Sequence, residues 1–313
     1  KKRSLSRSRS ASNGMDKPQI IGLGLNGLIG SRITQLLSDK YNFISLSRSN
    51  RVDIVDPVSL TNIKDYPDAD FVLNLAAKAD VDGCEEDKSL GERGEAWKVN
   101  VEGAKNVAEI CRESGKKLIH ISTDFVFDGI IGKEEKYDEN DLPNPINWYG
   151  KTKYEGERAV GKSRADYIIL RLSYPYRANS DIKKDFFRTI LESLQQGIKV
   201  KAVTDHIFCP TFIDDIVFAI ESLIKNDAMG IYHIVGSESL TPYDATLKIA
   251  KVFGLPQDLI EQTTRLEFFK DRALRPFNLA LENAKITKLG VEMKSFEEGL
   301  LEIKRQSSIA ENL

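Results

Sequence analysis

Short apolar runs alternate with helical patterns along the first half of the chain. The runs QIIGLG, FISLS, FVLNLAA, KLIHIST and YIILRLS hold five to seven mostly apolar residues each. Such nearly continuous apolar strands are typical of a parallel sheet that is buried on both faces. Between the runs, apolar positions recur at helical spacing, as in residues 25–39 and 96–113. This alternation predicts a doubly wound α/β fold over about the first 175 residues.

The pattern changes beyond that point. Helical spacing returns over residues 185–197, 211–226 and 241–255, and GIYHIVG at 230–236 indicates another strand. The helix at 241–255 begins with Thr-Pro, a capping residue followed by a proline in the first turn. We therefore expect a second, smaller mixed α/β domain that is interleaved with the main sheet.

Composition is that of an ordinary globular protein after an unusual start. The 313 residues are 41% hydrophobic and 29% charged, whereas residues 1–14 hold five basic residues and five serines. Such a segment predicts a disordered or added tail before a natural start at Met15; a basic arm for nucleic acid is the alternative. Removing its five positive charges takes the net charge from -2 to -7, which argues against nucleic-acid binding. We expect a cytoplasmic protein, because no apolar run reaches the ~18 residues needed to cross a membrane.

Metal-binding and disulfide patterns are absent from the sequence. The cysteines and histidines are few and scattered, without the pairwise spacing of a zinc site. We expect reduced thiols and no protein-held metal, and whether Mg²⁺ participates stays open. The residues concerned are Cys84, Cys111, Cys209, His120, His206 and His233.

A glycine-rich turn follows the first predicted strand directly. GLNGLIG places Gly24, Gly27 and Gly30 between that strand and its helix. Glycines here allow a tight turn, a close approach of the backbone to a pyrophosphate and close packing of helix on strand. The helix N-terminus adds amide donors and a positive dipole. This setting predicts a Rossmann-type NAD(P)-binding domain over residues 15–175, with 212–236 returning to it and 176–211 and 237–313 forming the smaller substrate-binding domain.

The choice between NADP(H) and NAD(H) depends on the residues after the second strand. An acidic residue there accepts the ribose 2′-hydroxyl, whereas an arginine accommodates a 2′-phosphate. The sequence SRSNR offers Arg48 and Arg51 and no acid. This favours NADP(H), with NAD(H) as the alternative, unless the arginines are only solvated loop charges.

One further stretch, NWYGKTKYEGE, carries the candidate chemistry. Tyr149 and Lys153 are four residues apart, so a helix would present them on one face. Together with ISTDFVFDG at 121–129 and RPFNLAL at 275–281, the stretch resembles the extended short-chain dehydrogenase/reductases that act on nucleotide sugars. Within them the chain is similar to the dTDP-4-dehydrorhamnose reductase family, also through GLNGLIG, DIVD, VLNLAAKADVDGCE and PTFIDDI, in the family's order and over nearly the whole length after Met15.

The resemblance implies a catalytic triad of Tyr149, Lys153 and Thr123. Ketone reduction needs a hydride and a proton, and a tyrosine with a pKa of about 10 is a poor proton donor near neutrality. A lysine one turn away is expected to lower that pKa and also to hold the nicotinamide ribose. Thr123 would orient the substrate carbonyl, with Ser122 as the alternative.

The resemblance also implies a set of binding residues. Asn100 is expected to anchor a water or the backbone, unless it is an ordinary polar helix position. The cofactor contacts are expected at Gly24, Asn26, Gly27, Leu28, Ile29, Gly30, Arg48, Asp53, Ile54, Asn74, Ala76, Ala77, Lys78, Tyr149 and Lys153, and the substrate contacts at Asp124, Phe125, Val126, Tyr174, His206 and Arg275.

The sequence departs from the family's pattern mainly around the sugar. Tyr174 stands where a tryptophan is usual, His206 where glutamine is common, and Phe125 where tyrosine is frequent. Lys78 also replaces a residue that is usually neutral or aromatic. Arg275 would grip the diphosphate, unless it forms a structural salt bridge. These changes leave the identity of the sugar open.

The implied function is NADP(H)-dependent reduction of a 4-keto nucleotide sugar by a homodimer. An NAD-dependent epimerase or dehydratase of the same superfamily is one alternative. A non-catalytic NADP-binding regulatory subunit is another, against which the intact Thr123, Tyr149 and Lys153 argue.

Overall fold

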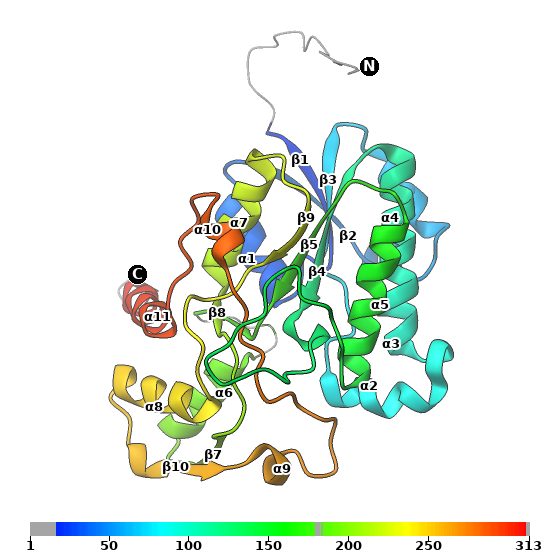
Figure 1. Cartoon of the computed structure of the whole chain (residues 1–313). Coiled ribbons are helices and arrows are strands. Elements are labelled where there is room, and N and C mark those ends of the chain that lie inside the picture. Colours follow the sequence, from blue (N-terminus) through cyan, green and yellow to red (C-terminus); the bar gives the residue numbers. More distant parts are fainter. Residues whose placement is uncertain (1–16, 179–181, 183, 311–313) are drawn as a thin grey trace.

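A six-stranded parallel sheet forms the centre of the larger lobe (Figure 1). The computed structural model describes residues 17–178, 182 and 184–310, so the predicted N-terminal tail lies outside the described residues. The sheet order is β2-β1-β3-β4-β5-β9, and every neighbouring pair is parallel. This confirms the predicted doubly wound sheet. Its strands are β1 (Gln19–Leu23), β2 (Asn42–Leu46), β3 (Ala69–Asn74), β4 (Lys117–Thr123), β5 (Tyr167–Leu172) and β9 (Gly230–His233).

The strand order reverses between β1 and β3. The chain runs outward from β1 to β2 and then returns to pair β3 with the other edge of β1. In open α/β sheets, ligands bind in the crevice at the carboxyl ends of the strands where such a reversal occurs. The predicted glycine turn follows β1 and the sequence LAA follows β3, so both lie at this crevice.

Helices cover both faces of the sheet, as the apolar strands require (Figure 1). On one face, Ile33 of α1 and Ile216 of α7 belong to one buried cluster. On the other face, Val107 of α4 packs with Val72 of β3 in a second cluster. The helices of this lobe are α1 (Leu28–Leu37), α2 (Val81–Asp87), α3 (Glu95–Trp97), α4 (Ala104–Ser114), α5 (Trp148–Lys162), α7 (Ile213–Lys225) and α10 (Ala284–Thr287).

The predicted helix over residues 96–113 contains an irregular turn. It begins as α3, passes through a π-helical segment, η4 (Lys98–Gly103), and continues as α4. Asn100 lies in this segment, where its side chain accepts from the Lys78 amide at 2.9 Å and donates to the Lys78 carbonyl at 3.0 Å. The extra residue in the turn therefore accompanies a side-chain clamp on the loop that follows β3.

A smaller lobe lies below the sheet in Figure 1. Its core is aromatic, with Tyr176, Phe187, Phe208 and Phe296 in one buried cluster. The predicted domain boundaries stay a prediction. The elements here are β6 (Pro175–Tyr176), α6 (Phe186–Gln195), β7 (Val200–Val203), β8 (Thr211–Phe212), α8 (Pro242–Phe253), β10 (Ile260–Thr263), α9 (Arg265–Phe268) and α11 (Phe296–Ala310), with parallel pairs β6-β8 and β7-β10.

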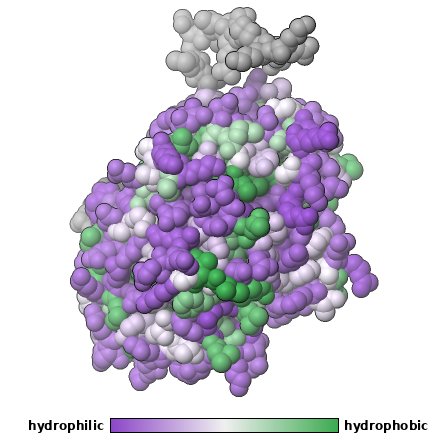
Figure 2. All heavy atoms as spheres, in the orientation of Figure 1, coloured by the Kyte–Doolittle hydropathy of each residue, from purple (hydrophilic) through white to green (hydrophobic). Residues whose placement is uncertain are grey.

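Hydrophilic side chains cover most of the face seen in Figure 2, and apolar side chains gather there only in small groups. Within the described part of the chain, none of the helices is both long and apolar enough to cross a membrane.

Candidate active site

Two cavities meet at the glycine turn. One has a volume of about 900 Å³ and extends past β2 and η3 (Lys88–Arg93), and the other, about 380 Å³, extends along the end of β4 toward α5. Both are lined by Gly24, Gly27, Leu75 and Ala77. The two volumes lie in the range of small-molecule sites. An elongated ligand with its middle at the helix N-terminus would occupy both of them.

The glycines of this turn leave no room for side chains. Gly24 has a φ of +84°, and a Cβ there would be 3.0 Å from the Ala76 amide nitrogen. At Gly30 a Cβ would be 2.5 Å from the Cα of Leu25. Gly27 caps α1 without a side chain, so amide donors of the first turn face a position that both cavities reach. This cradle fits a pyrophosphate, as the sequence predicts.

Cations outnumber acids around the larger cavity. Lys78 pairs with Glu95 at 2.7 Å, while Arg48, Arg93 and Lys98 have no salt-bridge partner among the residues that the structure describes. Arg48 therefore offers a free guanidinium to a phosphate at this end of the cavity. Arg51 does not line either cavity.

Helix α5 presents Tyr149 and Lys153 to the smaller cavity, one turn apart. The residues between them explain the spacing of the motif. A Cβ at Gly150 would be 2.1 Å from the Phe125 carbonyl oxygen, so only glycine lets the helix approach that segment. The Thr152 hydroxyl donates to the Tyr149 carbonyl and accepts from Asn100, both at 3.0 Å.

Thr123 ends β4 and faces the tyrosine. Thr123 lines the same cavity as Tyr149, and its hydroxyl lowers the pKa of the phenol. Lys153 donates from Nζ to the Ile121 carbonyl at 2.7 Å. The structure therefore brings the three predicted catalytic side chains together at the end of β4.

Burial dominates the electrostatics of these groups. It raises the pKa of Tyr149, against which the Thr123 hydroxyl acts, and it lowers the pKa of Lys153 to about 8, against which Glu157 acts. The expected lowering of the tyrosine pKa by Lys153 is wrong for the protein alone. The reason is that the phenol is buried and the ammonium donates to a backbone carbonyl instead.

A buried ion pair fixes α5 one turn beyond Lys153. Glu157 accepts two hydrogen bonds from Arg171 of β5, at 3.0 and 2.8 Å, and also accepts from the Ser122 hydroxyl. The side chains of Glu157 and Arg171 are 3% and 2% exposed, so the pair lies fully within the protein. The Ser122 hydroxyl is therefore bound to Glu157, whereas the Thr123 hydroxyl at this strand end is bound to Asp124.

Aromatic residues from both lobes form the wall of the smaller cavity opposite the glycine turn. Tyr174, with an unusual positive φ of +40°, packs against Phe125 with ring centroids 6.3 Å apart. Its hydroxyl is 3.2 Å from Nε2 of His206, while Nδ1 of His206 is 2.8 Å from the Pro276 carbonyl. Nδ1 must donate to that carbonyl, so Nε2 accepts from Tyr174. Burial lowers the pKa of His206 to about 4, and the ring is neutral.

Several predicted residues lie outside both cavity linings. Asn74 is buried and accepts from the Ala76 amide at 3.2 Å, which shapes the turn after β3. Arg275 pairs with Asp82 at 2.9 Å and lies over the Phe269 ring, so its guanidinium is engaged within the protein. The residues outside the linings are Asn26, Asn74, Val126, His206 and Arg275, and the remaining predicted site residues line one or both cavities.

The structure also adds lining residues that the sequence analysis did not identify. Leu90 and Lys98 line the larger cavity, and Val81, Pro175 and Phe186 line the smaller one. No local motif marks them; only the aromatic content of residues 174–187 could have indicated a wall. Among the described residues, no group of three or more His, Cys, Asp or Glu side chains is arranged to hold a metal ion.

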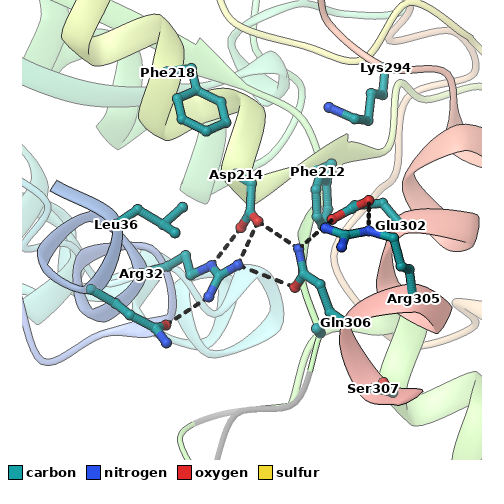
Figure 3. Close-up of a pocket in the computed structure, with 12 residues that line it drawn as sticks. Arg32, Leu36, Phe212, Asp214, Phe218, Lys294, Glu302, Arg305, Gln306 and Ser307 are labelled. Atoms are coloured by element: carbon teal, nitrogen blue, oxygen red, sulfur yellow. Dashed lines mark hydrogen bonds and ion pairs between the residues drawn. The ribbon is translucent and has the colours of Figure 1, made fainter. Parts of the chain in front are cut away.

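A third cavity, of about 680 Å³, lies apart from these residues, between α1, α7 and α11 (Figure 3). Arg32 donates to both carboxylate oxygens of Asp214 at 2.6 Å, and Gln306 bridges the same pair. Arg305 is likewise paired with Glu302 at 2.6 Å. The arginines that line this third cavity are thus paired with carboxylates, and none of the predicted site residues lines it.

The doubly wound sheet, the glycine turn and the Tyr-Lys helix define a short-chain dehydrogenase/reductase. The chain belongs to the RmlD substrate-binding domain family, whose model matches residues 18–308. It is 31% identical over 290 residues to the probable low-salt glycan biosynthesis reductase of Haloferax volcanii, covering 88% of this chain and 94% of that protein. It is 29% identical to a dTDP-4-dehydrorhamnose reductase of Aggregatibacter actinomycetemcomitans, over 90% of this chain and 96% of the relative.

A solved structure shows the same fold. The dTDP-4-dehydrorhamnose reductase of Bacillus anthracis, in complex with NADP, superposes with a TM-score of 0.84 at 28% identity. The match covers 93% of this chain and 100% of that chain.

Proposed function

We propose that this protein is a nucleotide-sugar reductase that uses NADPH to reduce a 4-keto sugar, the leading candidate being conversion of dTDP-4-dehydro-6-deoxy-mannose to dTDP-rhamnose. The family and the relatives named as reductases support this function. The observation that carries it is that Tyr149, Lys153 and Thr123 line one cavity, which begins at the glycine turn.

The chemistry divides between cofactor and protein. When bound, NADPH supplies the hydride. Tyr149 gives its proton to the ketone oxygen as negative charge develops there, and Thr123 donates a hydrogen bond that orients the same oxygen. Lys153 holds the nicotinamide ribose, and its ammonium stabilises the phenolate left on Tyr149. Burial of all three excludes water from the reacting atoms.

The cofactor preference rests on the larger cavity. The free guanidinium of Arg48 suits a 2′-phosphate, and the relative from Bacillus anthracis was solved with NADP. Asp53 lines the same cavity, but it accepts from the Val55 amide at 3.0 Å in its own turn. We therefore place NADP(H) ahead of NAD(H).

The alternative functions have less support. An epimerase or dehydratase would oxidise and re-reduce its substrate and retain NAD, and a regulatory subunit would need no catalytic triad. Matches to proteins named as reductases favour neither. We further propose that the protein is cytoplasmic and forms a homodimer. Light scattering on the purified protein would test the homodimer.

The test is a panel of freshly prepared 4-keto nucleotide sugars with NADPH and NADH. We expect oxidation of NADPH only when the keto sugar is present, with the alcohol formed in equal amount. Tyr149→Phe is the control, since it removes a single oxygen atom. No oxidation with any keto sugar, or purified protein that retains stoichiometric NAD, would contradict the proposal.

A further inference from the structure

A carboxyl group lies directly behind the hydroxyl that orients the substrate. Asp124 follows Thr123 in η5 (Asp124–Val126), lines the smaller cavity and is only 1% exposed. No salt bridge reaches it from the residues that the structure describes. Its side-chain partners are two hydroxyls instead: Thr123 Oγ1 is 2.9 Å from Oδ1, and Ser173 Oγ is 2.6 Å from Oδ2. A buried carboxylate with no cation is costly.

The number of protons on these hydroxyls limits what they can do. Ser173 accepts from the Cys209 amide at 3.2 Å, so its one proton goes to Asp124. Thr123 accepts from the Phe125 amide at 3.3 Å and also has one proton. If Asp124 is ionised, that proton also points at the carboxylate. Thr123 then has no proton left with which to hold a ketone oxygen.

A proton on Asp124 reverses this hydrogen bond. The carboxylic acid donates from Oδ1 to Thr123 Oγ1, while Oδ2 still accepts from Ser173. The Thr123 proton is then free to point into the cavity, toward the ketone oxygen or toward Tyr149. The distances of 2.9 Å between Thr123 and Asp124 and of 2.6 Å between Asp124 and Ser173 suit either direction of these hydrogen bonds, so the reversal needs no movement of heavy atoms.

We propose that Asp124 carries a proton in the reacting enzyme, and that this proton makes Thr123 the hydrogen-bond donor to the substrate carbonyl. This inference rests on the proposed function. Asp124 is a positioning residue here: its proton stays in place through the reaction, and the proton that reaches the product comes from Tyr149.

The surroundings of Asp124 support a protonated state near neutrality. Burial raises the pKa of Asp124 to about 7, and its hydrogen bonds from Ser173, from Thr123 and from the backbone amides of Phe125 and Asp124 act in the opposite direction. Three buried groups nearby, Tyr149, Tyr174 and Cys209, already resist ionisation. A negative charge on Asp124 raises the pKa of each of them further. The other titratable groups around this cavity are Lys153, the Glu157–Arg171 pair, the neutral His206, Cys84, and Lys184 and Asp185 of its lining.

The proposal predicts a specific pH profile. In the wild-type enzyme kcat/KM falls as the pH rises through about 7, where Asp124 loses its proton. Asp124→Asn keeps the donor to Thr123 and the acceptor for Ser173 but cannot ionise. We expect its pH profile to lose that fall, so that the alkaline limb moves toward about 8, where Lys153 titrates.

A second variant shifts the profile without touching the cavity. Ser173→Ala removes a hydrogen bond that stabilises ionised Asp124, so the pKa of Asp124 rises and the alkaline limb moves to higher pH. A merely structural role for Asp124 would lower the melting temperature of both variants and leave the limb in place. An unchanged limb in Asp124→Asn, or a loss of more than about 100-fold with folding and NADPH binding intact, would overturn the proposal.

Infrared difference spectroscopy separates this inference from the proposed function. The spectrum of the wild type minus Asp124→Asn shows whether the carboxyl group is protonated, and it needs no sugar substrate. We expect a carboxylic acid band at about pH 6 that vanishes by about pH 8. If the band is present and no keto sugar is reduced, the proposed function fails alone; if the sugar is reduced and the band is absent at pH 6, this inference fails alone.

Discussion

The two ends of the active-site crevice are built from different materials. The end around the glycine turn is made of backbone: Gly24 and Gly30 leave no room for a Cβ, and Ala76 lies against the turn. The sugar end is made of side chains from distant segments, such as Phe125, Tyr174 and His206. A site made of backbone tolerates almost no substitution, whereas a site made of side chains can change its shape while the fold stays the same.

Three of the four departures from the family's pattern, Phe125, Tyr174 and His206, lie at the sugar end. Two of them, Tyr174 and His206, contact one another through a hydrogen bond of 3.2 Å, although they are 32 residues apart. The tyrosine at 174 and the histidine at 206 therefore form a bonded pair in place of the residues that are usual in the family. The specificity of the enzyme should vary at this end and its cofactor at the other, and the following experiments test that division.

The largest effect is expected at the point where the two ends meet. Tyr149→Phe removes the proton donor and keeps the ring that packs on Phe125 at 5.7 Å. We expect turnover to fall by about 10³-fold, within the range for loss of a general acid. The melting temperature and NADPH affinity should stay unchanged, as checked by calorimetry. Turnover within 10-fold of the wild type would remove Tyr149 from the mechanism.

At the backbone-built end, Gly30→Ala should destabilise the fold itself. A Cβ at this position would be 2.5 Å from a Cα and 2.7 Å from a carbonyl oxygen, neither of which can move freely. We expect a loss of ~3 kcal/mol in unfolding free energy and weak NADPH binding, measured by denaturant titration and calorimetry.

Gly161→Ala is the matched control for this glycine. Gly161 lies in α5 (Trp148–Lys162), and a Cβ there would be 3.8 Å from its nearest neighbour. The variant should gain ~0.5 kcal/mol through helix propensity. Equal destabilisation by the two substitutions would show that the glycine turn is not special.

A smaller effect is expected at the phosphate end of the larger cavity. Arg48→Ala should raise the KM for NADPH by ~10–100-fold, the cost of one charged hydrogen bond, and leave the KM for NADH unchanged. Arg51→Asn is the control, because Arg51 lies outside the lining and asparagine tolerates its positive φ of +64°. An equal rise for both cofactors would mean that Arg48 does not read the 2′-phosphate.

The smallest effect is expected at the sugar end. His206→Gln and Tyr174→Trp should each raise the KM for the keto sugar by ~3–10-fold, because each breaks the bond between the two side chains. The double variant restores the pair that is usual in the family. It should recover part of the loss, whereas fully additive losses would show that the two positions act independently. The KM for NADPH is the internal control.

The sequence predicted those parts of the structure that depend on local pattern. The strands follow from apolar runs, the glycine turn from its place after QII, and the facing of Tyr149 and Lys153 from their spacing in a helix. Each of these needs only neighbours along the chain.

Features that depend on tertiary contacts were not predictable in the same way. The π-helical turn places Asn100 where its side chain accepts from the Lys78 amide. Arg275 pairs with Asp82, which is 193 residues away in the sequence. The same holds for the pKa of Tyr149. The spacing predicts that Lys153 lowers it, whereas burial, which the whole fold determines, raises it.

The pair of Glu157 and Arg171 has a practical consequence for engineering. A designer who grafted the helix with its tyrosine and lysine onto another scaffold would also import an acid whose counter-charge belongs to a different strand. Left alone in the interior, that acid would cost ~3–5 kcal/mol. The helix must therefore be transplanted together with β5, and with β4 as well, because β4 ends at Thr123.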